Sequence, residues 1–286
     1  MFDDLRRKFE TDGYAVIEGF FSNEEVEEMK NEALNLIKQM PNAAERTEFD
    51  ASNSDGEQNK SKYFIDSSDK ISYFFESGAF DPNGELLVAP ELSLNKIGHA
   101  LHELNSVFRK YTFCERIKEA AFQLGFEDPV VPQSMYIFKN PGKSSEVMAH
   151  QDATYIHTEP TSCVGFWIPL DDTTIENGCL WFSRGSHKSG VHRRYIRNPD
   201  KTSEDLLVFT SPAPYYQKSN FTAVPVKKGS CILIHGQVVH FSEPNKSKTP
   251  RNAYTFHIVE QKNTKYSEDN WAQPKEGKSF MSLYRN

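Results

Sequence analysis

The sequence predicts an α+β protein whose core is a jelly roll or a β-barrel. Apolar residues recur at helical spacing in the N-terminal part, and from Pro129 onward short β-branched and aromatic runs alternate with Gly, Pro, Asn and Ser clusters. We expect one domain over residues 1–286. It would comprise a helical part over about 1–128, a jelly-roll core over about 129–262 and a C-terminal tail.

The N-terminal part contains one clearly marked helix. A short apolar strand candidate, Gly13–Phe21, precedes Ser22 and Glu25, which have the spacing of a capping box and so begin a helix. The apolar stripe of this helix comprises Val26, Met29, Ala33, Leu36, Ile37 and Met40. The following segment, residues 43–62, is polar throughout and predicts a solvated loop.

Two further apolar stripes predict a second pair of helices. They comprise Ile97, Leu101, Leu104 and Phe108, and then Ile117, Ala121 and Leu124 before Gly125. After this pair the period changes to two, which is typical of strands. The predicted strands are Val131–Lys139, Cys163–Leu170, Cys179–Phe182, Phe221–Val226, Cys231–His235 and Ala253–Val259.

Charge and composition argue against several classes of partner. The 33 Lys and Arg residues against 40 Asp and Glu give a formal net charge of -7, which argues against nucleic acid. No apolar run approaches the roughly 20 residues needed to cross a membrane. The four cysteines form no Cys-x-x-Cys pair and no charged-then-apolar leader opens the chain, so we expect a cytoplasmic protein with reduced thiols. A monomer acting on a small molecule is our default expectation.

The segment MAHQDATYI suggests a metal site. His150 and Asp152 stand two residues apart, and in a strand this spacing directs both side chains to one face. A lone His-x-Asp also occurs by chance, as a polar pair with no metal. A facial ligand set with open positions requires one more imidazole. The segment Gly229–His257 contains two candidates, His235 and His240.

The same segment carries a basic residue suited to binding a carboxylate. Arg251 lies eleven residues after His240, in a predicted strand, turn, strand setting. Its planar guanidinium can hold a carboxylate through two parallel hydrogen bonds. Because the histidines and this arginine occur together, a metal site with an adjoining carboxylate-binding site is a better interpretation than a chance polar pair.

Over its whole length the sequence resembles the phytanoyl-CoA dioxygenase family. The resemblance rests on DGYAVIEGFFS, QSMYIFKNPG, HQDATYIHTEP and ENGCLWFSRGSH, and on the His240 and Arg251 block. It implies a double-stranded β-helix core with Fe(II) on His150, Asp152 and His240, because the family places its ligand histidine eleven residues before the arginine. It also implies that 2-oxoglutarate chelates the iron while its distal carboxylate meets Arg251.

The resemblance implies further residues of the cosubstrate pocket. Ser247 is expected as the hydroxyl partner of Arg251, and Lys96, Met135 and Trp167 are expected to line the pocket. Lys96, Met135 and Trp167 each have a simpler interpretation: a surface charge on a helix, a core residue and a packing residue, respectively. The remaining histidines considered, expected to be structural or surface residues, are His157, His187, His192 and His257. Among them, His187 is a candidate for supporting the site through hydrogen bonds.

The implied activity is that of a 2-oxoglutarate-dependent dioxygenase. It would couple O2-dependent decarboxylation of 2-oxoglutarate to succinate and CO2 with hydroxylation of an unidentified small substrate, for which an acyl-CoA or a related molecule is one candidate. Asp152 argues against a halogenase, in which a small residue leaves room for chloride. We expect substrate selectivity to lie in the long polar segment Lys188–Asn220.

Two alternatives stay open. The first is a non-catalytic jelly-roll protein that binds metal or 2-oxoglutarate as a sensor or scaffold. The second is a cupin-like zinc or manganese enzyme, which would leave Arg251 and Ser247 without a role.

Overall fold

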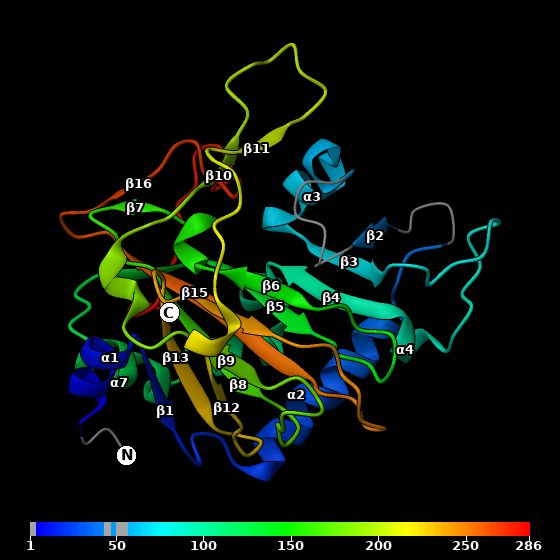
Figure 1. The fold of residues 1–286 in the computed structure, drawn as a ribbon, viewed down its shortest axis with the longest axis horizontal. Helices are drawn as coiled ribbons and strands as arrows, with labels where there is room; N and C mark the ends of the chain where they lie inside the picture. The colour runs from blue at the N-terminus through cyan, green and yellow to red at the C-terminus, as the bar shows by residue number, and fades with distance from the viewer. Residues whose placement is uncertain (1–3, 43–46, 50–56) are drawn as a thin grey trace.

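The fold is a sandwich of two largely antiparallel β-sheets with helices packed against the larger one (Figure 1). A computed structural model describes residues 4–42, 47–49 and 57–286. Within these residues the larger sheet has nine strands and the smaller has four. This arrangement confirms the predicted α+β jelly roll.

The large sheet joins strands from every part of the chain. In spatial order it comprises β1 (Tyr14–Ile17), β13 (Cys231–His235), β8 (Val164–Pro169), β15 (Ala253–Glu260), β5 (Pro129–Ile137), β4 (Leu94–His99), β3 (Ile71–Glu76) and β2 (Thr47–Phe49), with β17 (Met281–Ser282) paired to β5. The small sheet comprises β12 (Thr222–Val224), β9 (Leu180–Phe182), β14 (His240–Ser242) and β6 (Val147–His150). Two short ribbons pair β10 (Tyr195–Arg197) with β11 (Leu207–Phe209), and β7 (Thr158–Glu159) with β16 (Lys265–Tyr266).

Strand register determines which residues of the large sheet face the small one. Trp167, Thr255 and Met135 are direct neighbours across β8, β15 and β5, so their side chains lie on the same face. Trp167 packs in one apolar cluster with Leu180 and Phe182 of the small sheet. This face therefore lines the interior of the sandwich.

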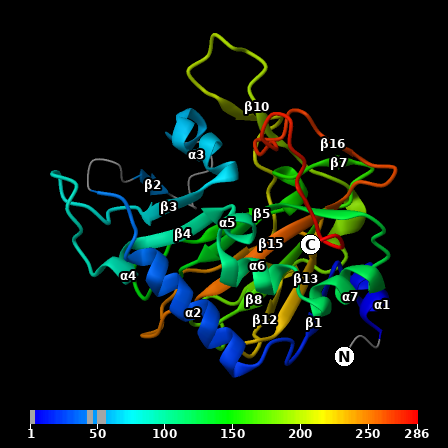
Figure 2. The same cartoon turned by 180° about the vertical axis from the view of Figure 1, so that it is seen from behind.

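Helices cover the opposite face of the large sheet (Figure 2). The helices of the described residues are α1 (Leu5–Asp12), α2 (Asn23–Ile37), α3 (Lys62–Asp66), α4 (Pro90–Ser93), α5 (Leu101–Leu104), α6 (Ser106–Thr112) and α7 (Glu115–Gln123). Of these, α3 lies instead on the side of Lys96, where its Phe64 packs with Phe74 and Trp271. Phe108 of α6 lies 4.7 Å from the Tyr254 ring, and Phe166 stacks on Phe256, in the main apolar core. Among the described residues no helix is both long and apolar enough to pass through a bilayer.

Helix α2 begins as expected from the sequence. The Ser22 hydroxyl accepts a hydrogen bond from the Glu25 backbone N–H, and the Glu25 carboxylate accepts one from the Ser22 N–H. These bonds satisfy two backbone donors that the first helical turn leaves without partners. The predicted stripe from Val26 to Ile37 is buried against the sheet.

The expectation of a helical part over 1–128 was wrong in part, because this region supplies β2, β3 and β4 to the large sheet in addition to the expected strand, β1. Ile97, assigned to a helical stripe, lies in β4, and Leu104 from the same stripe is 52% exposed. The segment Leu94–His99 is buried on nearly every side chain. A strand covered on both faces loses its two-residue period, so a chance spacing resembled a helix.

The predicted polar loop, residues 43–62, falls partly outside the described residues, at 43–46 and 50–56. Its described part is not all loop, since β2 pairs in parallel with β3 and a 3₁₀ helix, η2 (Glu57–Lys60), follows. Pairing with a distant strand is tertiary information that a polar local sequence does not contain.

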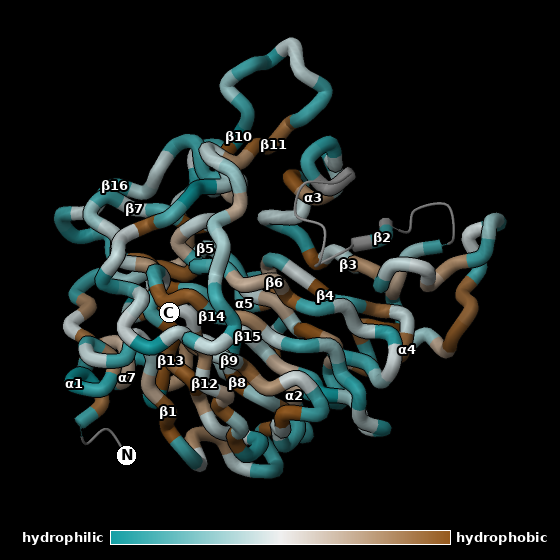
Figure 3. Tube along the Cα trace, in the orientation of Figure 1, coloured by the Kyte–Doolittle hydropathy of each residue, from teal (hydrophilic) through white to brown (hydrophobic). Residues whose placement is uncertain are grey.

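The segment Lys188–Asn220 leaves the sandwich and returns to it. The segment begins within the 3₁₀ helix η5 (Ser186–Ser189), forms the projecting β10–β11 hairpin and ends with the 3₁₀ helix η6 (Lys218–Asn220). The loop between β10 and β11 is hydrophilic, whereas the strands carry apolar residues (Figure 3). Tyr195 and Leu207 from this hairpin are buried against Trp271 near the C-terminus.

Candidate metal and cosubstrate site

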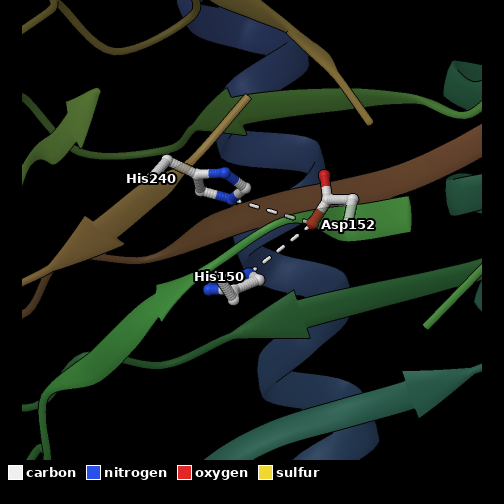
Figure 4. A group of neighbouring side chains, drawn as sticks. All are labelled: His150, Asp152 and His240. Carbon is white, nitrogen blue, oxygen red and sulfur yellow. Dashed lines mark ion pairs between the residues drawn. The ribbon is translucent and has the colours of Figure 1, made fainter. Parts of the chain in front are cut away.

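Three side chains, two from neighbouring strands of the small sheet and one from the segment just after β6, converge at one end of the sandwich interior (Figure 4). His150 is the last residue of β6, His240 is the first residue of β14, and the two face each other in the antiparallel pair. Asp152 completes the group. One ligand atom from each of the three lies within 4.8 Å of the others.

His150 and Asp152 do not share a strand, contrary to the expectation. Strand β6 ends at His150, and Asp152 opens a 3₁₀ helix, η4 (Asp152–Thr154). Gln151 between them keeps an extended backbone, with φ -114° and ψ 137°. The alternation of side chains therefore persists for one more step, so that both ligands still point the same way.

Hydrogen bonds to the backbone set the tautomer of both histidines. Nδ1 of His150 lies 2.7 Å from the Met148 carbonyl oxygen, and Nδ1 of His240 lies 3.1 Å from that of Val238. A carbonyl only accepts, so Nδ1 of each ring carries the hydrogen and donates it. Each Nε2 consequently presents a lone pair, which is the form that binds a metal.

The atoms that the three side chains turn toward one another are all hydrogen-bond acceptors. The two Nε2 atoms lie 3.6 and 3.7 Å from Oδ1 of Asp152, beyond a normal hydrogen bond. Three acceptors facing one another repel unless a cation lies between them. The donor set thus fits a divalent metal, and two imidazoles with one carboxylate are the facial set typical of non-haem iron.

Burial keeps this set in its metal-binding protonation state. It lowers the pKa of His240 to about 4, with the neighbouring His150 acting in the same direction. Burial opposes ionisation of Asp152, but His257 and His240 hold the pKa of its carboxyl well below the usual range. At neutral pH the ligands are therefore a neutral His240 and an anionic Asp152.

The competing His235 lies away from the metal group. In β13 the neighbouring Ile234 belongs to the interior cluster, so His235 points to the other side of the strand. Its ring packs against Phe9 and His187, and its Nδ1 accepts a hydrogen bond from the Gln237 N–H. His187 in turn lies 3.0 Å, through Nε2, from the Glu10 carbonyl oxygen, so it supports the N-terminal helix rather than the metal group.

Arg251 is a buried cation at the other end of the same interior face. Its backbone pairs with Lys139, continuing β15 and β5, and it is 2% exposed. Burial lowers its pKa to about 10, so it stays charged at neutral pH, and its guanidinium lies 5.2 Å from the Trp167 ring centroid. Nε and Nη1 have no hydrogen-bond partner within the described part of the chain. A buried guanidinium in this state is costly unless an anion binds it.

Lys96 and Met135 line the interior beside Trp167. Lys96 lies in β4 rather than on a helix, so the surface-charge interpretation was wrong, and it is 9% exposed. Its Nζ lies 5.4 and 5.1 Å from the ring centroids of Phe64 and Phe74, and burial lowers its pKa to about 7. Met135 borders Gly98, where an added Cβ would lie 3.0 Å from the Met135 Cγ.

The hydroxyl of Ser247 is engaged within its own turn. It lies 2.7 Å from Oδ1 of Asn245 and 3.0 Å from the Thr249 carbonyl oxygen. Ser242 is a buried hydroxyl on the interior face of β14, because it pairs with Leu180 just as His240 pairs with Phe182. Its position two residues after His240 was the signal that could have identified it.

A second buried cation adjoins Arg251. Lys139 is 2% exposed, and its Nζ donates to the Ser145 carbonyl oxygen at 3.0 Å. Glu76, also buried, accepts from Asn95 Nδ2 at 3.1 Å and from Ser145 Oγ at 3.3 Å. Burial raises the pKa of Glu76 to about 7, although Asn95 and Lys139 act to lower it.

Glu76 is expected to make stability fall as pH rises from about 4.5 through about 7. The native state holds this proton more tightly than the unfolded chain, whose glutamates titrate near 4.5, so each step upward in this window favours unfolding. Urea unfolding at a series of pH values checks this, and Glu76→Gln should flatten the slope there. Glu204→Gln, on the surface, serves as control. An unchanged slope in Glu76→Gln would contradict the assignment.

Comparison with known proteins identifies the family. The sequence model of the phytanoyl-CoA dioxygenase family matches residues 9–253. The chain belongs to the phytanoyl-CoA dioxygenase family. It is 46% identical to phytanoyl-CoA dioxygenase domain-containing protein 1 of Bos taurus, over 97% of each chain, and 44% identical to the homologue of that protein in Caenorhabditis elegans, over 99% of each.

The fold is also found among solved structures. The epimerase SnoN, in complex with Fe3+, alpha ketoglutarate and nogalamycin RO, superimposes with a TM-score of 0.63 at 17% identity, covering 98% of this chain and 92% of that one. Membership of the phytanoyl-CoA dioxygenase family, together with the His150, Asp152 and His240 group, confirms the predicted enzyme class: a 2-oxoglutarate-dependent non-haem iron oxygenase, with iron(II) as cofactor and 2-oxoglutarate and O2 as cosubstrates.

Proposed function

We propose that this chain hydroxylates a small organic substrate at an iron(II) held by His150, Asp152 and His240. The main support for this proposal is that the interior of the sandwich contains two sets of polar atoms without a bonding partner of their own. Three acceptor atoms converge at one end, and at the other end two nitrogens of the Arg251 guanidinium, Nε and Nη1, find no hydrogen-bond partner among the residues that the structure describes. A metal chelated by a dicarboxylate satisfies both groups at once.

Each residue has a definite task in this proposal. Iron(II), when bound, supplies the chemistry by which O2 oxidises 2-oxoglutarate to succinate and CO2 and converts a substrate C–H bond to an alcohol. Arg251 binds the distal carboxylate, while Trp167 orients the guanidinium and keeps water away from it. Met135 and Lys96 line the cosubstrate pocket on the side of β4 and β5. Ser242, rather than the expected Ser247, supplies the hydroxyl that acts together with Arg251.

The substrate approaches from the side of His150. The His150 side chain is 20% exposed whereas that of His240 is 7% exposed, so the metal group is more open at His150. Tyr155 borders this opening, with its ring 5.9 Å from that of His150, and packs against Tyr195 and Phe209 of the projecting hairpin. The segment Lys188–Asn220 therefore adjoins the substrate entrance.

Hydrogen bonds also join Gln151, which lies between the ligands His150 and Asp152, to the segment Lys188–Asn220. The link runs through the buried side-chain amide of Gln151, which accepts a hydrogen bond from the His192 N–H at 2.8 Å and donates one to the Gly190 carbonyl oxygen at 2.8 Å. At the entrance the Arg193 guanidinium lies 3.7 Å from the Phe209 ring centroid. A cation there favours an anionic substrate, and an acyl-CoA is the first class to screen.

The remaining parts of the proposal rest on composition. The net charge of -7 supports a protein without a nucleic-acid partner, and four cysteines without a paired motif support a cytoplasmic one. We propose that the enzyme acts as a monomer.

Formation of succinate from 2-oxoglutarate, without added substrate, tests the function. Protein loaded anaerobically with iron should produce succinate slowly once O2 is admitted, and His150→Ala should produce none. His157→Ala is a matched control, because the His157 side chain is 16% exposed and lies outside the metal group. Bound iron without succinate from the wild-type chain would favour the sensor or scaffold alternative.

A further inference from the structure

We infer that His257 is a positioning residue that holds Asp152 in place as a single-oxygen metal ligand. The inference rests on the proposed function, since it concerns the same metal group. His257 was expected to be a structural or surface histidine, yet it is 5% exposed and contacts a metal ligand.

The two oxygens of Asp152 face different partners. Oδ1 lies toward Nε2 of both ligand histidines, whereas Oδ2 lies 3.1 Å from Nε2 of His257. A carboxylate engaged in this way offers one oxygen to the metal and keeps the other bound to the protein. The carboxylate is thus prevented from turning to chelate the metal through both oxygens.

A second hydrogen bond determines which nitrogen of His257 donates. Nδ1 lies 3.1 Å from Nε2 of Gln133, and the Gln133 amide nitrogen can only donate. Nδ1 is therefore the acceptor, and the ring hydrogen sits on Nε2, where it is donated to Oδ2 of Asp152. In the series of hydrogen bonds from Gln133 through His257 to Asp152, each bond therefore has one donor and one acceptor.

The strands provide the space that this arrangement needs. Gln133, His257 and Gly165 are direct neighbours across β5, β15 and β8. Gly165 has no side chain in this row, and a Cβ there would lie 2.9 Å from Oδ2 of Asp152 and 3.5 Å from Cδ2 of His257. The Asp152 carboxylate occupies the place of the missing side chain.

The position of Asp152 in the chain explains why it needs such support. His150 and His240 are held by strand pairing, but Asp152 lies just beyond the end of β6, in a short 3₁₀ helix. Its orientation therefore depends on side-chain contacts with the large sheet. A single-oxygen carboxylate leaves metal positions open for a chelating cosubstrate and for O2, which a two-oxygen carboxylate would occupy.

The test measures metal binding rather than turnover. Anaerobic competition titration gives the affinity for Co(II) and Fe(II), and the visible absorption of bound Co(II) reports the coordination geometry. His257→Phe keeps a ring but loses the donor, and we expect affinity to fall roughly 10- to 100-fold with an altered Co(II) spectrum. His257→Gln places an amide N–H near the position of Nε2 and should recover most of both.

Two further variants make the test decisive. Gly165→Ala leaves His257 intact but displaces Oδ2, so it should weaken metal binding in the same way even if the phenylalanine variant folds poorly. His102→Gln is the matched control, since His102 is 3% exposed and bonds to Ser134 away from the metal, and it should change neither readout. If folded His257→Phe and Gly165→Ala both show the wild-type affinity and the wild-type Co(II) spectrum, the inference about His257 is overturned but the proposed function is not. A wild-type chain that binds neither metal would overturn the proposed function as well.

Discussion

Replacing His240 by alanine is expected to abolish iron binding and, with it, succinate formation. The change removes one of three ligand atoms and leaves a space that opens the buried metal group. Loss of a direct ligand should exceed the roughly 10- to 100-fold that loss of an outer partner costs. Metal content after anaerobic loading and gel filtration, together with succinate formation, checks the expectation.

His235→Ala is the matched control for this variant. His235 is the other histidine of the same strand, turn, strand segment, burial also lowers its pKa to about 4, and its ring packs against Phe9 rather than the metal group. We expect His235→Ala to lower the melting temperature while keeping iron and turnover. The reverse pattern, with iron lost from His235→Ala and kept by His240→Ala, would show that the ligand set is wrong.

Replacing Arg251 by alanine is expected to raise the KM for 2-oxoglutarate by about 10- to 100-fold, with a smaller effect on kcat. A hydrogen bond to a charged group contributes about 1.5–3 kcal/mol, and 1.4 kcal/mol corresponds to a factor of ten. Arg251→Lys should recover only part of the loss, because an ammonium cannot form two parallel hydrogen bonds with one carboxylate. Steady-state kinetics at saturating O2 measures both parameters.

A cosubstrate analogue separates loss of the carboxylate contact from a general disturbance. 2-Oxopentanoate keeps the chelating end of 2-oxoglutarate but lacks the distal carboxylate. Wild-type protein should strongly prefer 2-oxoglutarate, and Arg251→Ala should bind the two almost equally. If the preference persists in Arg251→Ala, another residue binds the distal carboxylate, and the buried Lys139 is the next to replace.

The cosubstrate should also stabilise the wild-type chain more than the variant. The free chain contains a buried guanidinium with two nitrogens unpaired, whereas binding of a carboxylate satisfies them. The rise in melting temperature with 2-oxoglutarate, measured with iron replaced by Co(II), should therefore shrink in Arg251→Ala.

Local patterns in the sequence were sufficient for several features. The capping box at Ser22 and Glu25 begins α2, because its partners lie three residues apart and need no tertiary contact. The two-residue spacing of His150 and Asp152 was also informative, since an extended Gln151 keeps both side chains on one side. The short β-branched and aromatic runs after Pro129, separated by Gly, Pro, Asn and Ser clusters, likewise predicted the strands.

The tertiary structure gives the physical reason why residues that look alike in the sequence differ in their surroundings. His240 rather than His235 joins the metal group, because His235 points away from the interior. Ser242 lies on that interior face, whereas the Ser247 hydroxyl is hydrogen-bonded within its own turn, and His257 reaches Asp152 across more than a hundred residues of chain. Spacing along the chain determines the direction of a side chain within one element, but the pairing of distant strands determines what that side chain meets.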